Sequence, residues 1–187
     1  MKQTKLIAIG GSAGSLNVII KLLPRLKPDF NIPLVIVLHR KKAINSSLAA
    51  IFSHKTPLNV KEVEDKDPIL PGNVYLAPAD YHLLIEKEGT FSLDASEKIL
   101  FSRPSIDVTF ETAAEAYRES LTCFLLSGAN ADGTRGLQKV REYGGTVVIQ
   151  NPSTAEISFM PNHALANLDI DFVLDCNEMA TFINKLD

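Results

Sequence analysis

The sequence predicts an α/β protein with a doubly wound, mostly parallel sheet, helices on both faces and an added antiparallel hairpin. Three observations predict this class. Short runs of apolar and β-branched residues alternate with stretches of helical periodicity, the runs are as long as buried strands, and one region lacks a helix between its strands. Strands that are apolar along their whole length are typical of parallel sheets covered by helices.

The first half of the chain alternates between strands and helices and then continues with strands that have no helix between them. Strands are predicted at residues 6–9, 34–38 and 60–63, with helices at 15–26 and 46–53 between them. Strand character follows at 73–77, 83–86 and 90–93, with no helix in between. Because residues 87–89, Lys-Glu-Gly, form a short turn, the last two of these strands are predicted to pair as an antiparallel hairpin appended to the sheet.

The second half returns to the alternation. Helices are predicted at residues 105–120, 134–143, 161–167 and 177–186, and strands at 122–126, 146–150 and 172–174. Ser105 is a suitable N-cap for the first of these helices, and Asp107 would complement its dipole. With no internal repeat and no long linker, residues 1–187 are predicted to form a single domain.

Composition narrows the classes of function. The chain has 187 residues, 45% of them hydrophobic, and a formal net charge of -3, which argues against nucleic acid as the main partner. Two cysteines, Cys123 and Cys176, are too few for a disulfide framework. No signal-peptide core or membrane-length apolar run is present, so we expect a soluble, cytoplasmic protein that does not insert into a membrane.

A glycine-rich turn, GGSAGS, follows the first predicted strand and precedes the first helix. It lacks the second and third glycines of a dinucleotide fingerprint and the lysine of a phosphate-binding loop. It does satisfy the G-x-S-x-G pattern of a nucleophile turn, with Ser12 at its centre. On its own the pattern is weak, because small residues occur in many such turns.

A serine nucleophile requires a base and a group that orients the base. His39 ends the second predicted strand, and Asp132 follows the strand predicted at 122–126. In a parallel sheet both would lie at the same edge as Ser12. The alternatives are ordinary loop roles: a polar histidine at a strand end and an Asp-Gly turn. His54, His82 and His163 are assigned structural or surface roles.

Taken together, these stretches resemble the catalytic domain of the CheB family, the bacterial chemotaxis protein-glutamate methylesterases. The resemblance covers nearly the whole chain. It depends on several segments in the same order: IGGSAGS, VIVLHR, PGNVYLAPADYHLLI, RPSIDVTF, LLSGANADGTRGL and GGTVVIQNPSTAEISFMPNHAL. It implies a serine hydrolase that removes methyl esters from glutamate side chains of methyl-accepting chemotaxis receptors, often with glutamine deamidation.

The resemblance also implies residue roles. It places the nucleophile at Ser12, the base at His39, the orienting carboxylate at Asp132, and an oxyanion hole at the backbone N–H groups of Ala13 and Ala129. It implies no metal and no organic cofactor, and the sequence contains no H-E-x-x-H motif or cysteine cluster.

Two loops depart from the family pattern. Arg40, Lys41 and Lys42 stand where the family has Met-Pro, and Ala129 and Asn130 alter the aspartate loop. We expect the three basic residues to contact acidic receptor helices, with a solvated basic loop as the alternative, and Asn130 to lie near the substrate.

The chain begins at the first strand of the predicted catalytic domain. We therefore expect no receiver domain within this chain and a possible separate receiver protein as partner. Two rival functions remain at this point. One is a catalytically weak CheB-like domain that acts as a signalling scaffold, and the other is a nucleotide-binding domain, which the incomplete phosphate motifs disfavour.

Overall fold

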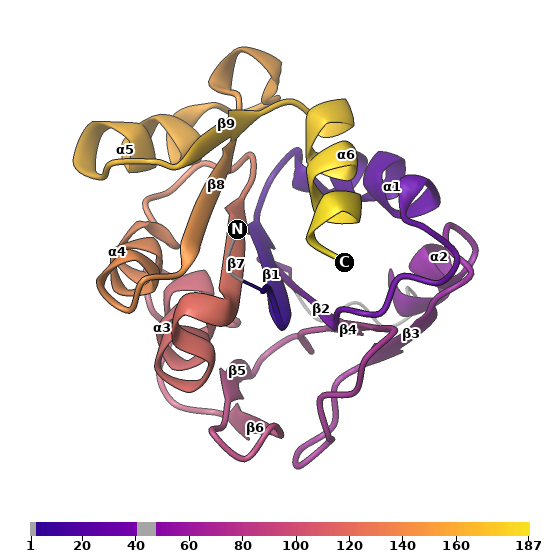
Figure 1. Cartoon of the computed structure of the whole chain (residues 1–187). Coiled ribbons are helices and arrows are strands. Elements are labelled where there is room, and N and C mark those ends of the chain that lie inside the picture. The colour runs from indigo at the N-terminus through magenta and orange to yellow at the C-terminus, as the bar shows by residue number, and fades with distance from the viewer. Residues whose placement is uncertain (1–2, 41–47) are drawn as a thin grey trace.

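The computed structural model describes residues 3–40 and 48–187, and within them a seven-stranded sheet forms the centre of the molecule (Figure 1). Its strand order is β3-β4-β2-β1-β7-β8-β9, and every neighbouring pair is parallel. The strands are β1 (Leu6–Gly11), β2 (Leu34–Leu38), β3 (Asn59–Glu62), β4 (Asn73–Leu76), β7 (Leu121–Leu125), β8 (Thr146–Gln150) and β9 (Phe172–Leu174). The predicted fold class is confirmed.

Helices cover both faces of this sheet. One layer contains α3 (Ile106–Tyr117), α4 (Thr134–Glu142) and α5 (Phe159–Asn167), and the other contains α1 (Ser15–Leu22), α2 (Leu48–Ser53) and α6 (Cys176–Leu186). Figure 1 shows α3 and α4 on one side of the strands and α1 and α6 on the other. Short 3-10 turns at Leu23–Arg25, Arg118–Ser120 and Pro152–Thr154 complete the helical structure.

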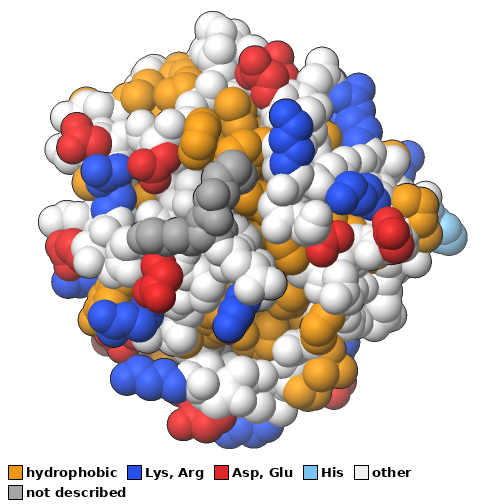
Figure 2. Space-filling model, viewed as in Figure 1, with side chains coloured by type: hydrophobic (Ala, Val, Ile, Leu, Met, Phe, Trp, Pro, Cys, Tyr) orange, Lys and Arg blue, Asp and Glu red, His pale blue; other side chains and the backbone are white. Residues whose placement is uncertain are grey.

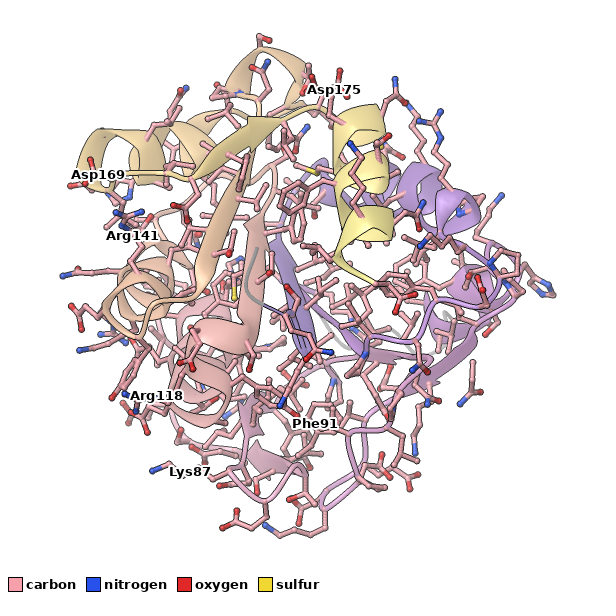
Figure 3. All side chains as sticks on the ribbon, in the orientation of Figure 1. Lys87, Phe91, Arg118, Arg141, Asp169 and Asp175 are labelled. Atoms are coloured by element: carbon pink, nitrogen blue, oxygen red, sulfur yellow. The ribbon has the colours of Figure 1, made fainter. Side chains whose placement is uncertain are left out.

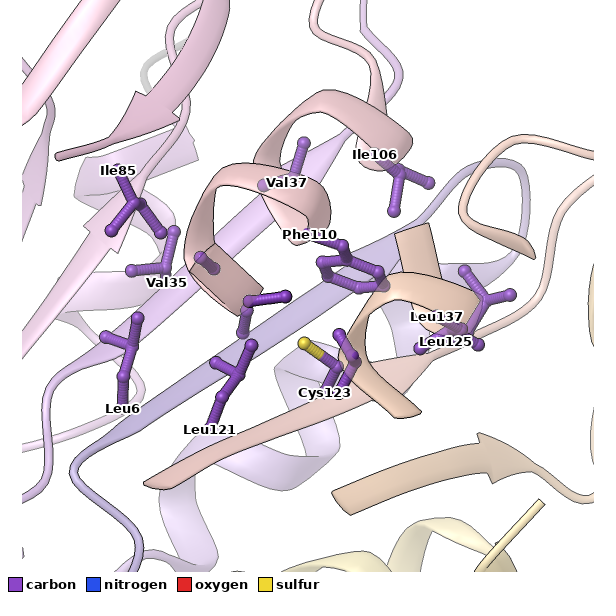
Figure 4. Close-up of a cluster of buried hydrophobic side chains, with 14 of the residues drawn as sticks. Leu6, Val35, Val37, Ile85, Ile106, Phe110, Leu121, Cys123, Leu125 and Leu137 are labelled. Carbon is purple, nitrogen blue, oxygen red and sulfur yellow. The ribbon is translucent and has the colours of Figure 1, made fainter. Parts of the chain in front are cut away.

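Side chains alternate between the two layers along each central strand. In β1, Leu6 and Ala8 face the α3 layer while Ile7 and Ile9 face the α1 layer, and all four are buried. Successive side chains of a strand point to opposite faces, so a strand buried on both sides must be apolar throughout. Figure 4 shows the core beneath α3, where Phe110 packs over β1 and β7.

Several helix ends differ from the sequence prediction by one to four residues, and two of the differences have a clear local reason. The helix predicted at residues 15–26 ends at Leu22 and continues as a 3-10 turn that contains Pro24. Proline has no N–H to donate to the carbonyl four residues earlier, so the α-helical pattern cannot continue through it. At the other end of the chain, α6 begins at Cys176, one residue earlier than predicted, because Asp175 and Glu178 form a capping box there. Asp175 lies just before α6 in Figure 3.

The hairpin exists but does not extend the main sheet. Strands β5 (His82–Ile85) and β6 (Phe91–Asp94) pair antiparallel as a separate two-stranded sheet. Backbone groups of β5 that do not pair with β6 form hydrogen bonds with side chains of α3 instead. Thr109 Oγ1 donates to the carbonyl of Leu83 (2.8 Å), and the N–H of Ile85 donates to Thr112 Oγ1 (3.1 Å). Two threonine hydroxyls thus take the place of a neighbouring strand's backbone.

The surface carries mixed charge. On the face shown in Figure 2, acidic and basic side chains are interspersed. Among the described residues no helix has both the length and the apolar character needed to cross a membrane.

The strand order determines where a site can form. β1 lies in the middle, β2 and β7 flank it, and the chain leaves β1 toward β2 and returns later to β7. Ligands in open α/β sheets bind beyond the carboxyl ends of the strands where the winding direction changes. The residues that follow β1, β2 and β7 therefore share the edge of the sheet where a ligand would bind.

The contact between α3 and α4 is close because of Gly136, and this gives a first prediction. A Cβ built at Gly136 would lie 2.6 Å from the Cβ of Phe110 and 3.0 Å from the carbonyl oxygen of Asp107. We expect Gly136→Ala to lower the free energy of unfolding by about 1–3 kcal/mol, measured by urea denaturation. The exposed Gln138→Ala on the same helix is the control and should change stability by less than about 0.5 kcal/mol. Equal effects would contradict the packing argument.

Candidate active site

Ser12 follows the last residue of β1 and precedes α1. Its N–H donates to the carbonyl of Ser127 (2.9 Å), which ties the turn after β1 to the turn after β7. The approach is close, because a Cβ at Gly128 would lie 3.1 Å from the Cβ of Ser12. Gly14, with φ of 82°, adopts a left-handed conformation that suits glycine and lets the chain turn into the helix. Ser12 is partly buried at the mouth of this turn.

His39 lies directly beside this turn. Gly11 and Leu38 are register partners in the parallel pair β1–β2, so Ser12 and His39 are the next residues along two neighbouring strands. The N–H of His39 donates to the carbonyl of Gly11 (3.1 Å) and continues that pairing. The imidazole is nearly buried, with 10% of the side chain exposed.

Asp132 is fully buried and hydrogen-bonds the imidazole. Its Oδ2 lies 2.7 Å from His39 Nε2. The same oxygen accepts from the N–H of Ile106 (2.7 Å), while Oδ1 accepts from the N–H of Asp107 (2.9 Å) and the hydroxyl of Ser105 (2.9 Å). The carboxylate therefore occupies the N-terminus of α3, where free N–H groups and the helix dipole favour a negative charge.

These contacts determine the protonation state of Asp132. Burial on its own would raise the pKa of this carboxyl, but the hydrogen bonds from His39 and the start of α3 outweigh it and lower the pKa below the usual value. A lowered pKa stabilises the folded protein above the ordinary pKa of an aspartate, and this contribution disappears as the pH falls through the lowered value. At neutral pH the carboxylate is ionised and can orient an imidazole.

Asp107 makes the reciprocal contact with α4. Its Oδ1 accepts from the N–H groups of Gly133 (2.8 Å) and Gly136 (2.7 Å) at the start of α4, while Asp132, just before α4, serves the start of α3. The two helices thus exchange capping carboxylates. Burial raises the pKa of Asp107 to about 6, and the nearby charge of Asp132 acts in the same direction.

Ser105 and His82 form a further layer behind Asp132. Ser105 stands at the predicted N-cap position of α3, but its hydroxyl donates to Asp132 and does not cap the helix. The N–H of Ser105 donates to His82 Nδ1 (3.1 Å), and His82 Nε2 lies 2.9 Å from the carbonyl oxygen of Glu97. Because Nδ1 accepts and Nε2 donates, the buried ring is held as the neutral Nε2–H tautomer. The roles of Ser105, Asp107 and His82 toward Asp132 were missed in the sequence.

The structure thus brings two of the three predicted triad members into contact. His39 and Asp132 are hydrogen-bonded, and Ser12 is adjacent to His39 in register. Among residues 3–40 and 48–187, no hydrogen bond joins the Ser12 hydroxyl to the His39 ring. Catalytic hydrogen bonds are often long without substrate and tighten when it binds.

The other predicted site residues have separate environments. Ala13 and Ala129 are exposed beside Ser12 and Asp132, in the turns after β1 and β7. Arg40 forms an ion pair with Glu62 and donates to the carbonyl of Ala77 (3.1 Å), whereas Lys41 and Lys42 lie outside the described residues. Asn130 accepts from the N–H of Asp132 (3.2 Å) and so shapes the aspartate loop.

A cavity of about 440 Å3 opens beside His39. Its lining residues are His39, Arg40, Asp80, Lys98, Phe101, Ser102 and Arg103. Three of these side chains are basic and one is acidic. In the described part of the chain, no group of three or more His, Cys, Asp or Glu side chains is arranged to hold a metal ion.

The donor set around Asp132 generates a second prediction. Both oxygens of Asp132 accept hydrogen bonds, so an asparagine there would point its NH2 group at existing donors. We expect Asp132→Asn to lower the free energy of unfolding by about 1–3 kcal/mol, measured by urea denaturation at pH 7. Asp107→Asn is the matched control, because its hydrogen bonds use Oδ1 alone and the amide oxygen can keep them. A larger loss in the control would contradict this account.

The raised pKa of Asp107 generates a third prediction. The folded state binds this proton up to about pH 6, so the group stabilises the fold at low pH, and that contribution is lost as the pH rises through about 6. Relative to wild type, Asp107→Asn should gain stability between pH 4.5 and 7.5, by at most about 3 kcal/mol. Denaturation curves across this range test the prediction, and parallel profiles for the two proteins would refute it.

Comparison with known proteins agrees with this arrangement. The family model for CheB methylesterase matches residues 7–183. A protein of Leptospira interrogans serovar Lai (strain 56601), provisionally assigned as a protein-glutamate methylesterase/protein-glutamine glutaminase, is 45% identical over 181 residues, which are 97% of this chain and 94% of that protein. The Thermotoga maritima protein-glutamate methylesterase/protein-glutamine glutaminase is 36% identical over 91% of this chain, which spans half of that longer protein.

The fold comparison gives the same answer. The crystal structure of the Thermotoga maritima CheB methylesterase catalytic domain superposes with a TM-score of 0.93 and 35% sequence identity, covering 98% of this chain and 99% of that one. The family model and the Leptospira relative each span nearly the whole chain. The chain belongs to the CheB methylesterase family.

Proposed function

We propose that this chain hydrolyses methyl esters of glutamate side chains in chemotaxis receptors, with Ser12 as nucleophile, His39 as base and Asp132 as orienting carboxylate. The observation that carries the proposal is the buried hydrogen bond from His39 to Asp132 at the edge of the sheet where Ser12 begins the turn after β1. Family membership and the names of the relatives supply the substrate. The relatives' double name supports glutamine deamidation at the same site.

The hydrogen bonding assigns the two ring nitrogens of His39. Nε2 faces Asp132, so Nδ1 is the nitrogen that takes the proton of Ser12 as its Oγ attacks the ester carbonyl carbon. Asp132 keeps the proton on Nε2 and stabilises the imidazolium that forms. The proton on Nδ1 then passes to the methoxy oxygen, methanol leaves, and the glutamyl group remains attached to Ser12.

Hydrolysis of this intermediate repeats the steps with water. Nδ1 takes a proton from water, the resulting hydroxide attacks the acyl carbon, and the proton returns to Ser12 Oγ as the carboxylate of glutamate leaves. For a glutamine substrate, ammonia departs in place of methanol. No step requires a group beyond the chain, the substrate and water.

The N–H groups of Ala13 and Ala129 serve as the oxyanion hole in this proposal. Each follows a strand that ends at the site, and neither N–H donates to a backbone carbonyl within the described residues. Two free donors in the turns after β1 and β7 can converge on a developing negative charge. Removing one such donor from a hydrolase costs about 3–4 kcal/mol of transition-state stabilisation.

The proposed substrate lies in the cytoplasmic, acidic helices of receptors. The cavity beside His39 supports this, because Arg40, Lys98 and Arg103 outnumber the single acidic residue, Asp80, in its lining. Electrostatic complementarity of this kind steers an acidic helix and fixes its register.

A catalytically weak scaffold is the second candidate function. The observation that favours it is that no hydrogen bond joins the hydroxyl of Ser12 to His39 among the described residues. A scaffold would retain the fold and the receptor contacts while hydrolysing esters slowly. Reaction with a fluorophosphonate separates the two, because only an activated serine is labelled rapidly.

Ser12→Ala tests the function directly. We expect release of methanol from methylated receptor to fall at least roughly 10³-fold, and fluorophosphonate labelling to disappear, because the nucleophile is gone. Ser120→Ala is the control, since this serine precedes β7 at the opposite edge of the sheet and donates to Tyr117. Wild-type protein that neither releases methanol nor becomes labelled would favour the scaffold.

Asp132→Asn tests the orienting role. We expect kcat to fall roughly 10²- to 10⁴-fold with a small change in KM, because the imidazole loses its correct tautomer while substrate contacts remain. Initial rates with a small ester are the measurement, at a temperature where circular dichroism shows the variant folded. Unchanged kcat would remove Asp132 from the mechanism.

A further inference from the structure

A two-residue turn next to the cavity holds an exposed phenylalanine. The N–H of Ile99 donates to the carbonyl of Ser102 (3.1 Å), and the N–H of Ser102 donates to the carbonyl of Ile99 (2.8 Å). Leu100 and Phe101 form the turn between them, with φ angles of 46° and 64°. Positive φ at both central residues is the requirement of a turn that normally contains Asn-Gly.

Neither residue is suited to this backbone. Side chains of L-amino acids crowd the backbone at positive φ, and leucine and phenylalanine lack the small or locally hydrogen-bonding side chain that relieves the strain. Burial does not compensate, because Phe101 is 96% exposed and Leu100 45% exposed. A strained residue that contributes no packing within its own chain indicates a function outside it.

The base of the turn is fixed. Arg103 Nη1 donates to the carbonyls of Ala95 and Ser96, each at 2.6 Å, and His82 holds the carbonyl of Glu97. The carbonyl of Leu100 accepts from Asn130 Nδ2 at 3.5 Å, which connects the turn to the aspartate loop. The backbone that carries Phe101 is therefore already fixed by hydrogen bonds, so binding through this residue would cost little backbone entropy.

The position of Phe101 defines what it faces. Phe101 and His39 line the same cavity, together with the basic side chains Arg40, Lys98 and Arg103. The guanidinium groups of Arg40 and Arg103 are fixed by their own hydrogen bonds, to Glu62 and the carbonyl of Ala77 and to the carbonyls of Ala95 and Ser96. An exposed apolar tip beside a cavity whose lining contains three basic side chains and one acidic one complements a surface that is both acidic and apolar.

We propose that Phe101 is an apolar anchor that sets the register of an acidic, amphipathic substrate helix at the active site. The inference rests on the proposed function and adds to it a residue that determines substrate specificity. The ester-bearing side chain of the helix reaches Ser12 beside His39, an acidic neighbour enters the basic cavity, and an apolar residue one turn away packs against Phe101. Residues three or four apart lie on one face of a helix, so a single face can make all three contacts.

The test uses an acidic helical peptide that carries one glutamate γ-methyl ester, with leucine one turn before and one turn after it. Binding of the fluorescein-labelled peptide is measured by anisotropy in a Ser12→Ala background, where no turnover occurs. We expect Phe101→Gly to weaken binding roughly 10-fold. We also expect its melting temperature to rise by roughly 2–4 °C, because glycine relieves the strain.

Two controls separate an anchor from a change in folding. Phe101→Leu keeps an apolar tip and should restore most of the binding. Leu70→Ser removes an exposed apolar side chain before β4, at the opposite edge of the sheet, and should leave the Kd unchanged.

The peptide provides the decisive comparison. Replacing its two leucines by serine should weaken binding to the Phe101 protein and have little further effect on Phe101→Gly, as a shared contact requires. Equal effects in both backgrounds, or a Phe101→Gly protein that binds as tightly as its parent, would overturn the inference while leaving the esterase proposal intact. So would self-association that depends on Phe101 with no change in peptide binding. Conversely, Phe101-dependent binding by a chain that hydrolyses no ester would support the anchor and refute the proposed function.

Discussion

The site depends on the hydrogen bonds that surround the buried carboxylate of Asp132. A charge removed from water is stable only when donors surround it, and here the first turn of α3, the hydroxyl of Ser105 and the ring of His39 all supply hydrogen bonds. The carboxylate joins a helix of one half of the sheet to the histidine that follows β2. Its position therefore determines the orientation of the imidazole, and the same contacts that stabilise the fold keep the group ionised.

The exchange of carboxylates between α3 and α4 extends this constraint. Asp132 satisfies N–H groups of α3, and Asp107 satisfies N–H groups of α4, so each helix begins at an acid from the other's sequence segment. This arrangement requires the two helices to lie close together, which Gly136 allows. The two acids lie close together in different environments. The pKa of Asp132 is lowered, whereas the pKa of Asp107 is raised.

Much of the fold could be predicted because the central strands are apolar on both faces. Their short apolar runs have the length of a buried strand and are too short for a helix. β2, β8 and β9 begin and end where the sequence predicted them, and the residues after β1, β2 and β7 were identified as one edge. The capping by Asp132 could not be predicted, since it depends on how α3 packs on α4 and not on residues near Ser105 in the sequence. The turn at Leu100 and Phe101 was equally hidden, because neither residue is typical of such a turn.

The hairpin is separate from the main sheet, yet it supports the segment that surrounds the Asp132 carboxylate. His82 is the first residue of β5, and it holds both the N–H of Ser105 and the carbonyl of Glu97. Partial unfolding of β5 and β6 would therefore release the support behind the buried carboxylate of Asp132 even while the seven central strands stay paired. In hydrogen–deuterium exchange, the amide of Ser105 should open together with those of the hairpin, because the support of the Asp132 carboxylate lasts only while the hairpin stays folded.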